Sequence, residues 1–371
     1  MGVTIYWGIV AAVIMFGQIM PQRGNNKKYY IIVMAVLHTF VCGFRYKFLT
    51  GDLIRYEADY QDLLYYGWFD EIIRERKNLG FVYFMKFCSE LFGGEFQFCL
   101  FLIALISEVA LAVLIFRYST KPWISYLVWN CMAFYIFGFS AIKQALAMAI
   151  ITCAMMCVLE KRLKWFLILV FLAGFIHAPA FCFLPAYWIA ERNINMKTIL
   201  MYIVAGVMIY AFRNPIVEFV TDIYYEEGQI QIVDTTLGGR FFVIVLILIC
   251  GFLLKGFQDR NFERVFNIIV VAAIFQMFSG FDNVFTRLAD YYLQFLVLFI
   301  PMIFYESDQQ TIQNPRGLPP VFSFNRRSIK ILVMLLTLVL VWWYYRTTLS
   351  VTISNEVDNY LNFRFFWDVV N

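Results

Sequence analysis

Long apolar segments recur along the whole 371-residue chain, and they constrain its fold more than any single motif does. They lie at residues 4–20, 29–44, 96–116, 123–139, 141–159, 165–176, 178–190, 198–212, 241–257, 265–280, 288–305 and 329–345. Hydrophobic residues make up 62% of the sequence and charged residues 15%, whereas a soluble domain is about 45–50% apolar and about 25% charged. Segments that cross a bilayer must satisfy their own backbone, which favours helices. We therefore expect an all-α polytopic membrane helical bundle of about 12 membrane segments, some of them short or broken.

Basic residues are concentrated in alternate connections between these segments, near residues 23–28, 117–121, 161–164, 192–197, 255–264 and 316–330. The positive-inside rule places these connections in the cytoplasm and both termini outside. We expect one integral membrane domain over residues 1–371. Its large outer loop spans 45–95, a second outer loop spans 213–240, a cytoplasmic loop spans 306–328, and an outer C-terminal tail spans 348–371.

The stretch FLAGFIHAPAFCFLP, residues 171–185, places His177 between two apolar runs and just before Pro179. A single helix over 165–190 would put the later basic connections outside, so we expect a break near His177, close to the outer face. A histidine that only satisfies local packing is the alternative interpretation.

The loop at 45–95 is long for a simple connection, and long ordered loops are typically functional. Its segment NLGFVYFMKFCSELFGG predicts an amphipathic interfacial helix. Earlier in the loop, Asp52 and Tyr56 stand four residues apart, which puts a carboxylate and a phenol on one helical face. A carboxylate can serve as general base, with Asp59 and Asp62 as competing candidates.

Further polar residues stand at predicted helix ends near the same membrane face. Lys143 and Gln144 begin one helix, and Arg287 begins another, with Asp282 before it and Asp290 after it. Together with His177 and the Arg45–Tyr56 segment, they provide the cations and helix N-termini that suit a pyrophosphate. The alternative for each cation alone is a charge that extends to the membrane interface.

The remaining chemistry-bearing residues suggest no cofactor. The eight cysteines lie mostly within apolar runs without CxxC spacing, so we expect neither a disulfide nor a metal site. Glu108 is the one acid deep in a predicted helix, and we assign it no catalytic role. No Walker or GxGxxG segment is present, and we expect no nucleic-acid partner.

The chain contains, in this order, the segments FRYKFLTGDLIRY, FSAIKQALAMAI, FIHAPAFCFLP and TRLADYYLQFLVLFIP. In these segments, their order and their spacing, the sequence resembles the EpsG-like, Wzy-type polymerases of bacterial exopolysaccharide, capsule and O-antigen. Lys143 stands where the family usually has arginine, and Gly51 directly adjoins Asp52, where family members often have an intervening residue.

The resemblance implies a GT-C-like membrane glycosyltransferase of the bacterial cytoplasmic (inner) membrane, with its active site facing outward. Such an enzyme moves a growing glycan from undecaprenyl pyrophosphate onto a lipid-linked repeat unit. Its partners would be the undecaprenyl-pyrophosphate-linked oligosaccharide and membrane lipid, with a chain-length regulator and a flippase as candidates. Asp52, His177 and Arg287 are the catalytic candidates, and Arg45, Tyr56, Lys143, Gln144 and Asp282 are the candidates for binding substrate and pyrophosphate.

Two other classes of protein stay open from the sequence. A flippase or transporter of lipid-linked oligosaccharide would show internal repeats and charges near the middle of the membrane. The sequence shows no internal repeat, and nearly all of its ionisable groups lie at the ends of the apolar segments. Another membrane glycan ligase or an acyltransferase would use His177 as its base.

Overall fold

The computed structural model describes residues 2–20, 24–217, 237–281, 283–306, 314–315, 317–349 and 363–369. Throughout these ranges the regular elements are helices, and one isolated antiparallel bridge joins Arg45 to Phe365. The expectation of an all-α protein is confirmed. The chain forms two compact units: unit 1 is Met1–Phe181 with Arg326–Asn371, and unit 2 is Cys182–Asn325.

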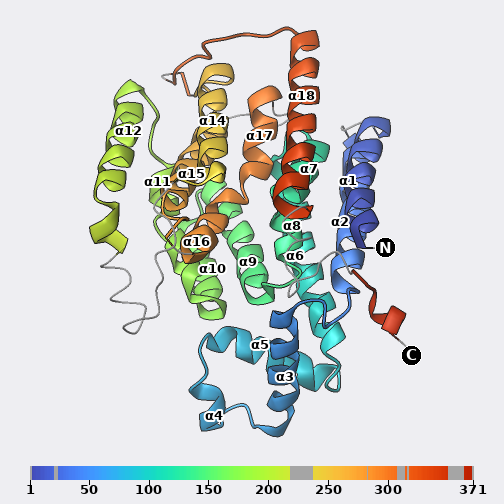
Figure 1. Ribbon diagram of the computed structural model, residues 1–371. Coiled ribbons are helices and arrows are strands. Elements are labelled where there is room, and N and C mark those ends of the chain that lie inside the picture. Colours follow the sequence, from blue (N-terminus) through green and yellow to red (C-terminus); the bar gives the residue numbers. More distant parts are fainter. Residues whose placement is uncertain are drawn as a thin grey trace. The chain divides into compact units, whose positions relative to one another are not determined.

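Unit 1 contains a bundle of apolar helices (Figure 1). Its members are α1 (Gly2–Ile19), α2 (Gly24–Gly43), α6 (Phe96–Tyr118), α7 (Pro122–Cys131), α8 (Phe134–Phe137), α9 (Ile142–Leu159), α10 (Leu163–Ile176) and α18 (Arg326–Tyr344), which the π-helical turn η3 (Tyr345–Leu349) extends. Helix α6 packs against α2 on one side and α9 on another, α10 packs on α9, and α1 and α18 both pack on α7.

The outer loop predicted at 45–95 folds as a small helical layer on unit 1. It contains α3 (Gly51–Asp62), the 3-10 turn η1 (Leu63–Tyr65), α4 (Glu71–Arg74) and α5 (Leu79–Leu91), which lie together in Figure 1. Helix α5 packs on α3, α6 and α10, and Tyr60, Leu63, Ile73 and Phe96 are fully buried beneath it. Gly93 and Gly94, both with positive φ, end the segment that was predicted as helical.

The chain breaks at His177, as the charge pattern predicts. Helix α10 ends at Ile176, and His177 is extended, with φ −146° and ψ 103°. The 3-10 turn η2 (Ala178–Phe183) and the short helix α11 (Ala186–Ala190) follow. Pro179 has no backbone N–H to continue the α-helical ladder, which explains why the helix stops here.

Two other predicted segments are broken where the apolar pattern gave no signal. The run at 123–139 divides into α7 and α8, because Ala133 has the left-handed φ of 67°. The run at 288–305 divides into α16 (Asn283–Leu293) and α17 (Leu296–Phe304), which meet at 47°.

Unit 2 contains α11, α12 (Met196–Ala211), α14 (Gly239–Leu254), α15 (Arg260–Gln276), α16 and α17. Helix α15 lies at its centre and packs against α11, α14, α16 and α17. Most of the second predicted outer loop, residues 218–236, lies outside the described residues.

By length and composition, three described helices can cross a membrane: Phe96–Tyr118, Ile142–Leu159 and Arg326–Thr347. A fourth span is possible if the bent pair Val284–Leu293 and Leu296–Phe304 counts as one. Shorter apolar helices are Thr4–Ile19, Leu163–Ile176, Ala178–Ala190, Met196–Ala211 and Gly239–Leu254. The described helices thus support a membrane protein, but fewer of them are long enough to span a bilayer than the apolar runs predicted.

Candidate active site

Arg45 holds the turn from which α9 begins. Its Nε donates to the carbonyl of Phe139 at 3.1 Å, its second terminal nitrogen reaches the carbonyl of Gly138 at 3.5 Å, and the remaining nitrogen donates to the carbonyl of Cys42. The guanidinium lies 5.4 Å from the centre of the Phe139 ring, and only 1% of the residue is exposed. Arg45 was predicted to bind pyrophosphate, but its fork is directed at backbone carbonyls, which fits a positioning role better.

Lys143 and Gln144 lie in the first turn of α9, directly after that turn. Lys143 is half-buried and Gln144 is buried, with its amide 3.9 Å from the Sδ of Met148. The N-cap residue Ala141 gives no side-chain cap to the helix. The first N–H groups of a helix and its dipole favour an anion, and the positive charge of a lysine in this turn acts in the same direction.

Asp52 lies in the first turn of α3 and is exposed. Its carboxylate forms an ion pair with Arg55 at 3.1 Å, one turn along the same helix. The competing candidates Asp59 and Asp62 both pair with Arg76, which bridges them. Asp52 is therefore held by a side chain that is itself 70% exposed and can move away, whereas the other two share a more buried arginine.

A single short turn of α5 connects Tyr56 with the break at His177. The Tyr56 ring packs edge-on against Phe81, with 5.6 Å between ring centres. Asn78, at the N-cap of α5 with φ 59°, accepts a hydrogen bond at 3.2 Å from the backbone N–H of Ala178. The same turn carries Gly80, where an added Cβ would lie 2.8 Å from the backbone of Phe175 in α10.

His177 itself is mostly buried, with 8% of its surface exposed. Its backbone N–H donates to Ala173 at 2.8 Å, and its carbonyl accepts from Ala180 at 2.9 Å. The sequence analysis did not single out Asn78 and Gly80. The available signal was an asparagine directly before a predicted helix, since asparagine tolerates the left-handed backbone that Asn78 adopts. In unit 1, Arg45 thus bonds the turn that precedes Lys143 and Gln144. The start of α5 contacts Tyr56 through Phe81, and it contacts the residue after His177 through Asn78.

Arg287 and Asp282 belong to unit 2. Asp282 lies outside the described residues, and Arg287 is exposed on α16. One turn further along α16, the buried Asp290 forms an ion pair at 2.7 Å with Arg240, at the start of α14. Arg240 was missed from the sequence. The Gly238-Gly239 pair directly before Arg240 was the available sign that a helix begins there.

Glu108 and His38 form polar contacts inside the unit 1 bundle. Trp129 donates to Glu108 at 3.2 Å, and His38 bonds both the carbonyl of Met34 at 2.7 Å and the amide of Asn130 at 2.9 Å. Since these side chains tie α2, α6 and α7 together, they stabilise the bundle. His38 was not singled out from the sequence.

Among the described residues, no group of three or more His, Cys, Asp or Glu side chains is placed to hold a metal ion. All eight cysteines are described, and each is a free thiol.

The helical bundle and its apolar spans define a helical membrane protein. Comparison with protein families then gives a specific result. The model of the EpsG family matches residues 28–315, and the chain belongs to this family. Searches among curated proteins and among solved structures find no match. The family membership confirms the resemblance inferred from the four sequence segments.

Proposed function

We propose that this protein is a polysaccharide polymerase of the bacterial cytoplasmic membrane, GT-C-like and with about 12 membrane segments. It transfers a growing glycan from undecaprenyl pyrophosphate to a lipid-linked repeat unit at the outer face. The observation that carries this proposal is the EpsG family match over residues 28–315, which supports a role in polysaccharide biosynthesis. The lysine in the first turn of α9 and the exposed carboxylate on α3 supply the chemistry it needs.

The reaction forms one bond and breaks one. The acceptor hydroxyl oxygen attacks the anomeric carbon of the donor, the bond from that carbon to the pyrophosphate oxygen breaks, and the electron pair leaves with the pyrophosphate. The hydroxyl proton goes to a general base. Charge develops on the leaving group, so fixed cations beside it lower the barrier.

Asp52 is our choice of base, because its carboxylate is exposed at the start of α3 and its partner Arg55 is also exposed. Lys143 and Arg287 stand in two of the sequence segments that resemble the family, and on that ground we assign them to the pyrophosphate. Arg45 fixes the turn before Lys143. Tyr56 packs on Phe81 of α5, and Asn78 before that helix bonds the backbone of Ala178, next to His177, so both candidates border the contact between α5 and α10.

The direct test uses purified protein and a lipid-linked repeat unit, with the products separated by size. The wild-type protein should give a ladder of polymers. A flippase would give none, and a ligase or acyltransferase would give a single product. Arg287→Ala should abolish the ladder at unchanged protein level, and Lys143→Arg should retain it because the family favours arginine there. A normal ladder from Arg287→Ala would remove Arg287 from the site.

The outward orientation has a separate test. In a variant without native cysteines, a cysteine at Asn193 should react only with a reagent applied from the cytoplasmic side. A cysteine at Gly228, which lies outside the described residues, should react only from the outside. Reaction of both from one side would overturn the proposed topology.

A further inference from the structure

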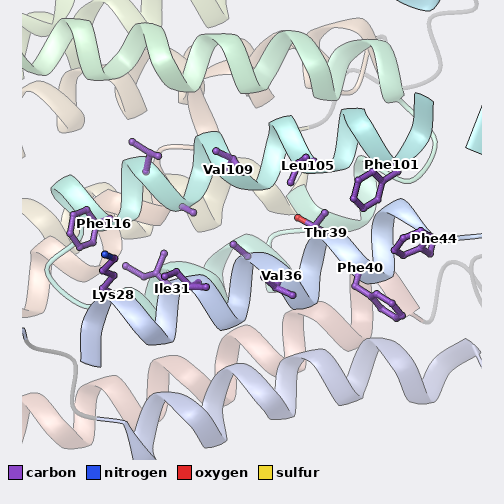
Figure 2. A pocket seen from close by; sticks show the side chains of 14 residues that line it. Lys28, Ile31, Val36, Thr39, Phe40, Phe44, Phe101, Leu105, Val109 and Phe116 are labelled. Atoms are coloured by element: carbon purple, nitrogen blue, oxygen red, sulfur yellow. The ribbon is translucent and has the colours of Figure 1, made fainter. Parts of the chain in front are cut away.

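An apolar groove of about 590 Å³ runs along unit 1 between α2 and α6 (Figure 2). Apart from Lys28 and Thr39, its lining side chains are apolar. Several of them are strongly exposed, including Val36 at 63% and Val109 at 47%. In a membrane this surface contacts lipid, and the shape of the groove limits which lipid chain can fill it.

The length of the groove limits the answer. Lys28 and Phe116 lie at one end, and Phe44 and Phe101 lie at the other (Figure 2). From Phe101 to Phe116, α6 rises about 22 Å at 1.5 Å per residue. One leaflet contributes about 15 Å of a hydrocarbon core of about 30 Å. A chain that fills the groove therefore reaches past the bilayer midplane, where the acyl chains of an ordinary phospholipid end.

The two ends of the groove differ in chemistry. Gln97 donates to the carbonyl of Gly43 at 2.7 Å, which closes α6 on α2 at the Phe44 end. Phe44 directly precedes Arg45, whose side chain positions the start of α9. The Phe44 end of the groove thus adjoins Arg45 in the chain. Lys28 lies at the opposite end, where its stem can line apolar surface and its ammonium can reach water.

The C-terminal segment forms an aromatic wall at the Phe44 end of this groove. Phe365 and Trp367 stack with 4.5 Å between ring centres, and Trp367 also lies within 6.0 Å of the Phe40 and Phe44 rings that line the groove. The backbone of Phe366 donates to the carbonyl of Phe44 at 3.0 Å. Rigid aromatic side chains at this point would guide a flexible chain where it leaves the headgroup.

We propose that the groove between α2 and α6 binds the isoprenyl chain of a polyisoprenyl diphosphate donor, with the diphosphate at the Phe44 end and the chain terminus near Lys28. This inference rests on the proposed function and adds the subsite for the lipid part of its substrate. A single long chain matches the length of the groove, and a diphosphate at the Phe44 end would lie beside the segment that begins with Arg45. Affinity comes from burial of apolar surface along the chain, so a shortened chain binds more weakly.

The test uses the full-length protein in nanodiscs and a long-chain polyisoprenyl diphosphate with a benzophenone at its chain terminus. Irradiation should label α2 or α6 near Lys28 and Phe116, as mapped by mass spectrometry. Ala35→Trp and Ala112→Trp, on the two half-buried walls of the groove, should each lower the labelling by about tenfold. Leu338→Trp is the matched control, because Leu338 is 61% exposed on α18, away from the groove lining.

Competitors separate the possible occupants. Excess unlabelled long-chain polyisoprenyl diphosphate should suppress the labelling, whereas phosphatidylglycerol and geranyl diphosphate should not. Suppression by phosphatidylglycerol would assign the groove to phospholipid, and equal labelling of the groove variants and the control would place the chain elsewhere. Either result overturns the proposal.

The same experiment separates this inference from the proposed function. Groove labelling by a protein that makes no polymer ladder would support the subsite and reject the polymerase. A ladder formed without groove labelling would retain the polymerase and reject the subsite.

Discussion

Pairs of an acidic side chain and an arginine differ in burial between the two units. In unit 2, Glu263 and Arg264 are fully buried and belong to a closed network, in which Arg264 bonds Glu191 at 2.8 Å and Glu263 bonds Arg260. In unit 1, Asp52 is exposed and pairs with the exposed Arg55. A buried network commits its charges to the fold, whereas an exposed pair can exchange its partner for a substrate.

The unit 2 network also fixes backbone. Asn267 donates to the carbonyls of Ala190 and Arg192 at 3.2 and 2.8 Å, and Tyr202 donates to Asn267 at 2.8 Å. The side chain of Asp259 caps α15 through the N–H groups of Asn261 and Phe262, and burial raises the pKa of this carboxyl. These contacts join three helices of unit 2 at one place.

The largest effect is expected from breaking the closed network. Arg264→Met removes a fully buried guanidinium and leaves the half-buried Glu191 with its ion pair to Arg260, so it should lower the free energy of unfolding by about 3 kcal/mol. Thermal unfolding of the purified protein measures the loss. The double variant Arg264→Met, Glu191→Leu should recover part of it, because the charge left behind is also removed. Wild-type stability of the single variant would show that the network is not closed.

The second-largest effect is expected from replacing Asp52, which should change the rate of chain extension but not the stability of the fold. Asp52→Asn should slow chain extension by about 10²-fold or more, because the amide cannot accept the hydroxyl proton. Its unfolding temperature should stay close to that of the wild type, since the side chain is exposed. The rate of chain extension and the unfolding temperature can both be measured on one preparation of the variant.

His177→Gln is the comparison for Asp52→Asn. Glutamine keeps a hydrogen-bond donor and acceptor but cannot exchange a proton at neutral pH. We expect a smaller loss of rate than for Asp52→Asn. The reverse order at equal protein level would exchange the two roles and make His177 the base.

Replacement of Arg45 is expected to affect both stability, as in the buried unit 2 network, and reaction rate, as at Asp52. Lysine cannot donate from one planar fork to the carbonyls of Cys42, Phe139 and Gly138. Arg45→Lys should therefore lower the free energy of unfolding by about 1.5–3 kcal/mol and slow extension. Arg55→Lys is the matched control, and its exposed pair should change stability by less than about 1 kcal/mol. Equal effects in both variants would remove the positioning role from Arg45.

The smallest effect is expected at Glu90 of α5. The hydrogen bond from Lys86 holds the pKa of this carboxyl below its ordinary value, with a further contribution from Trp68. A lowered pKa in the folded state stabilises the fold above the unfolded pKa, and this contribution is lost as the pH falls through the folded value. Glu90→Gln should be slightly less stable than the wild type at neutral pH, and the difference should vanish in acid. A constant difference across a pH series of melting curves would show that charge is not its cause.

Much of the fold could be predicted from the sequence, because each membrane segment must by itself be apolar and satisfy its own backbone hydrogen bonds. The apolar runs predicted an all-helical protein, the distribution of basic residues predicted the break at His177, and four short motifs indicated the EpsG family. The breaks at Ala133 and between α16 and α17 escaped prediction. The surrounding residues are uniformly apolar there, and a uniform pattern carries no information about where a helix turns.

The partners of the site residues were decided by the tertiary structure alone. Arg45 meets the carbonyl of Phe139, 94 residues away, and Arg240 meets Asp290, 50 residues away. The residue types predicted charge at these positions but not whether the charge would face a backbone carbonyl, another side chain or an exposed surface. The groove between α2 and α6 likewise exists only once the two helices pack. These features depend on contacts between distant parts of the chain, which local pattern and composition do not determine.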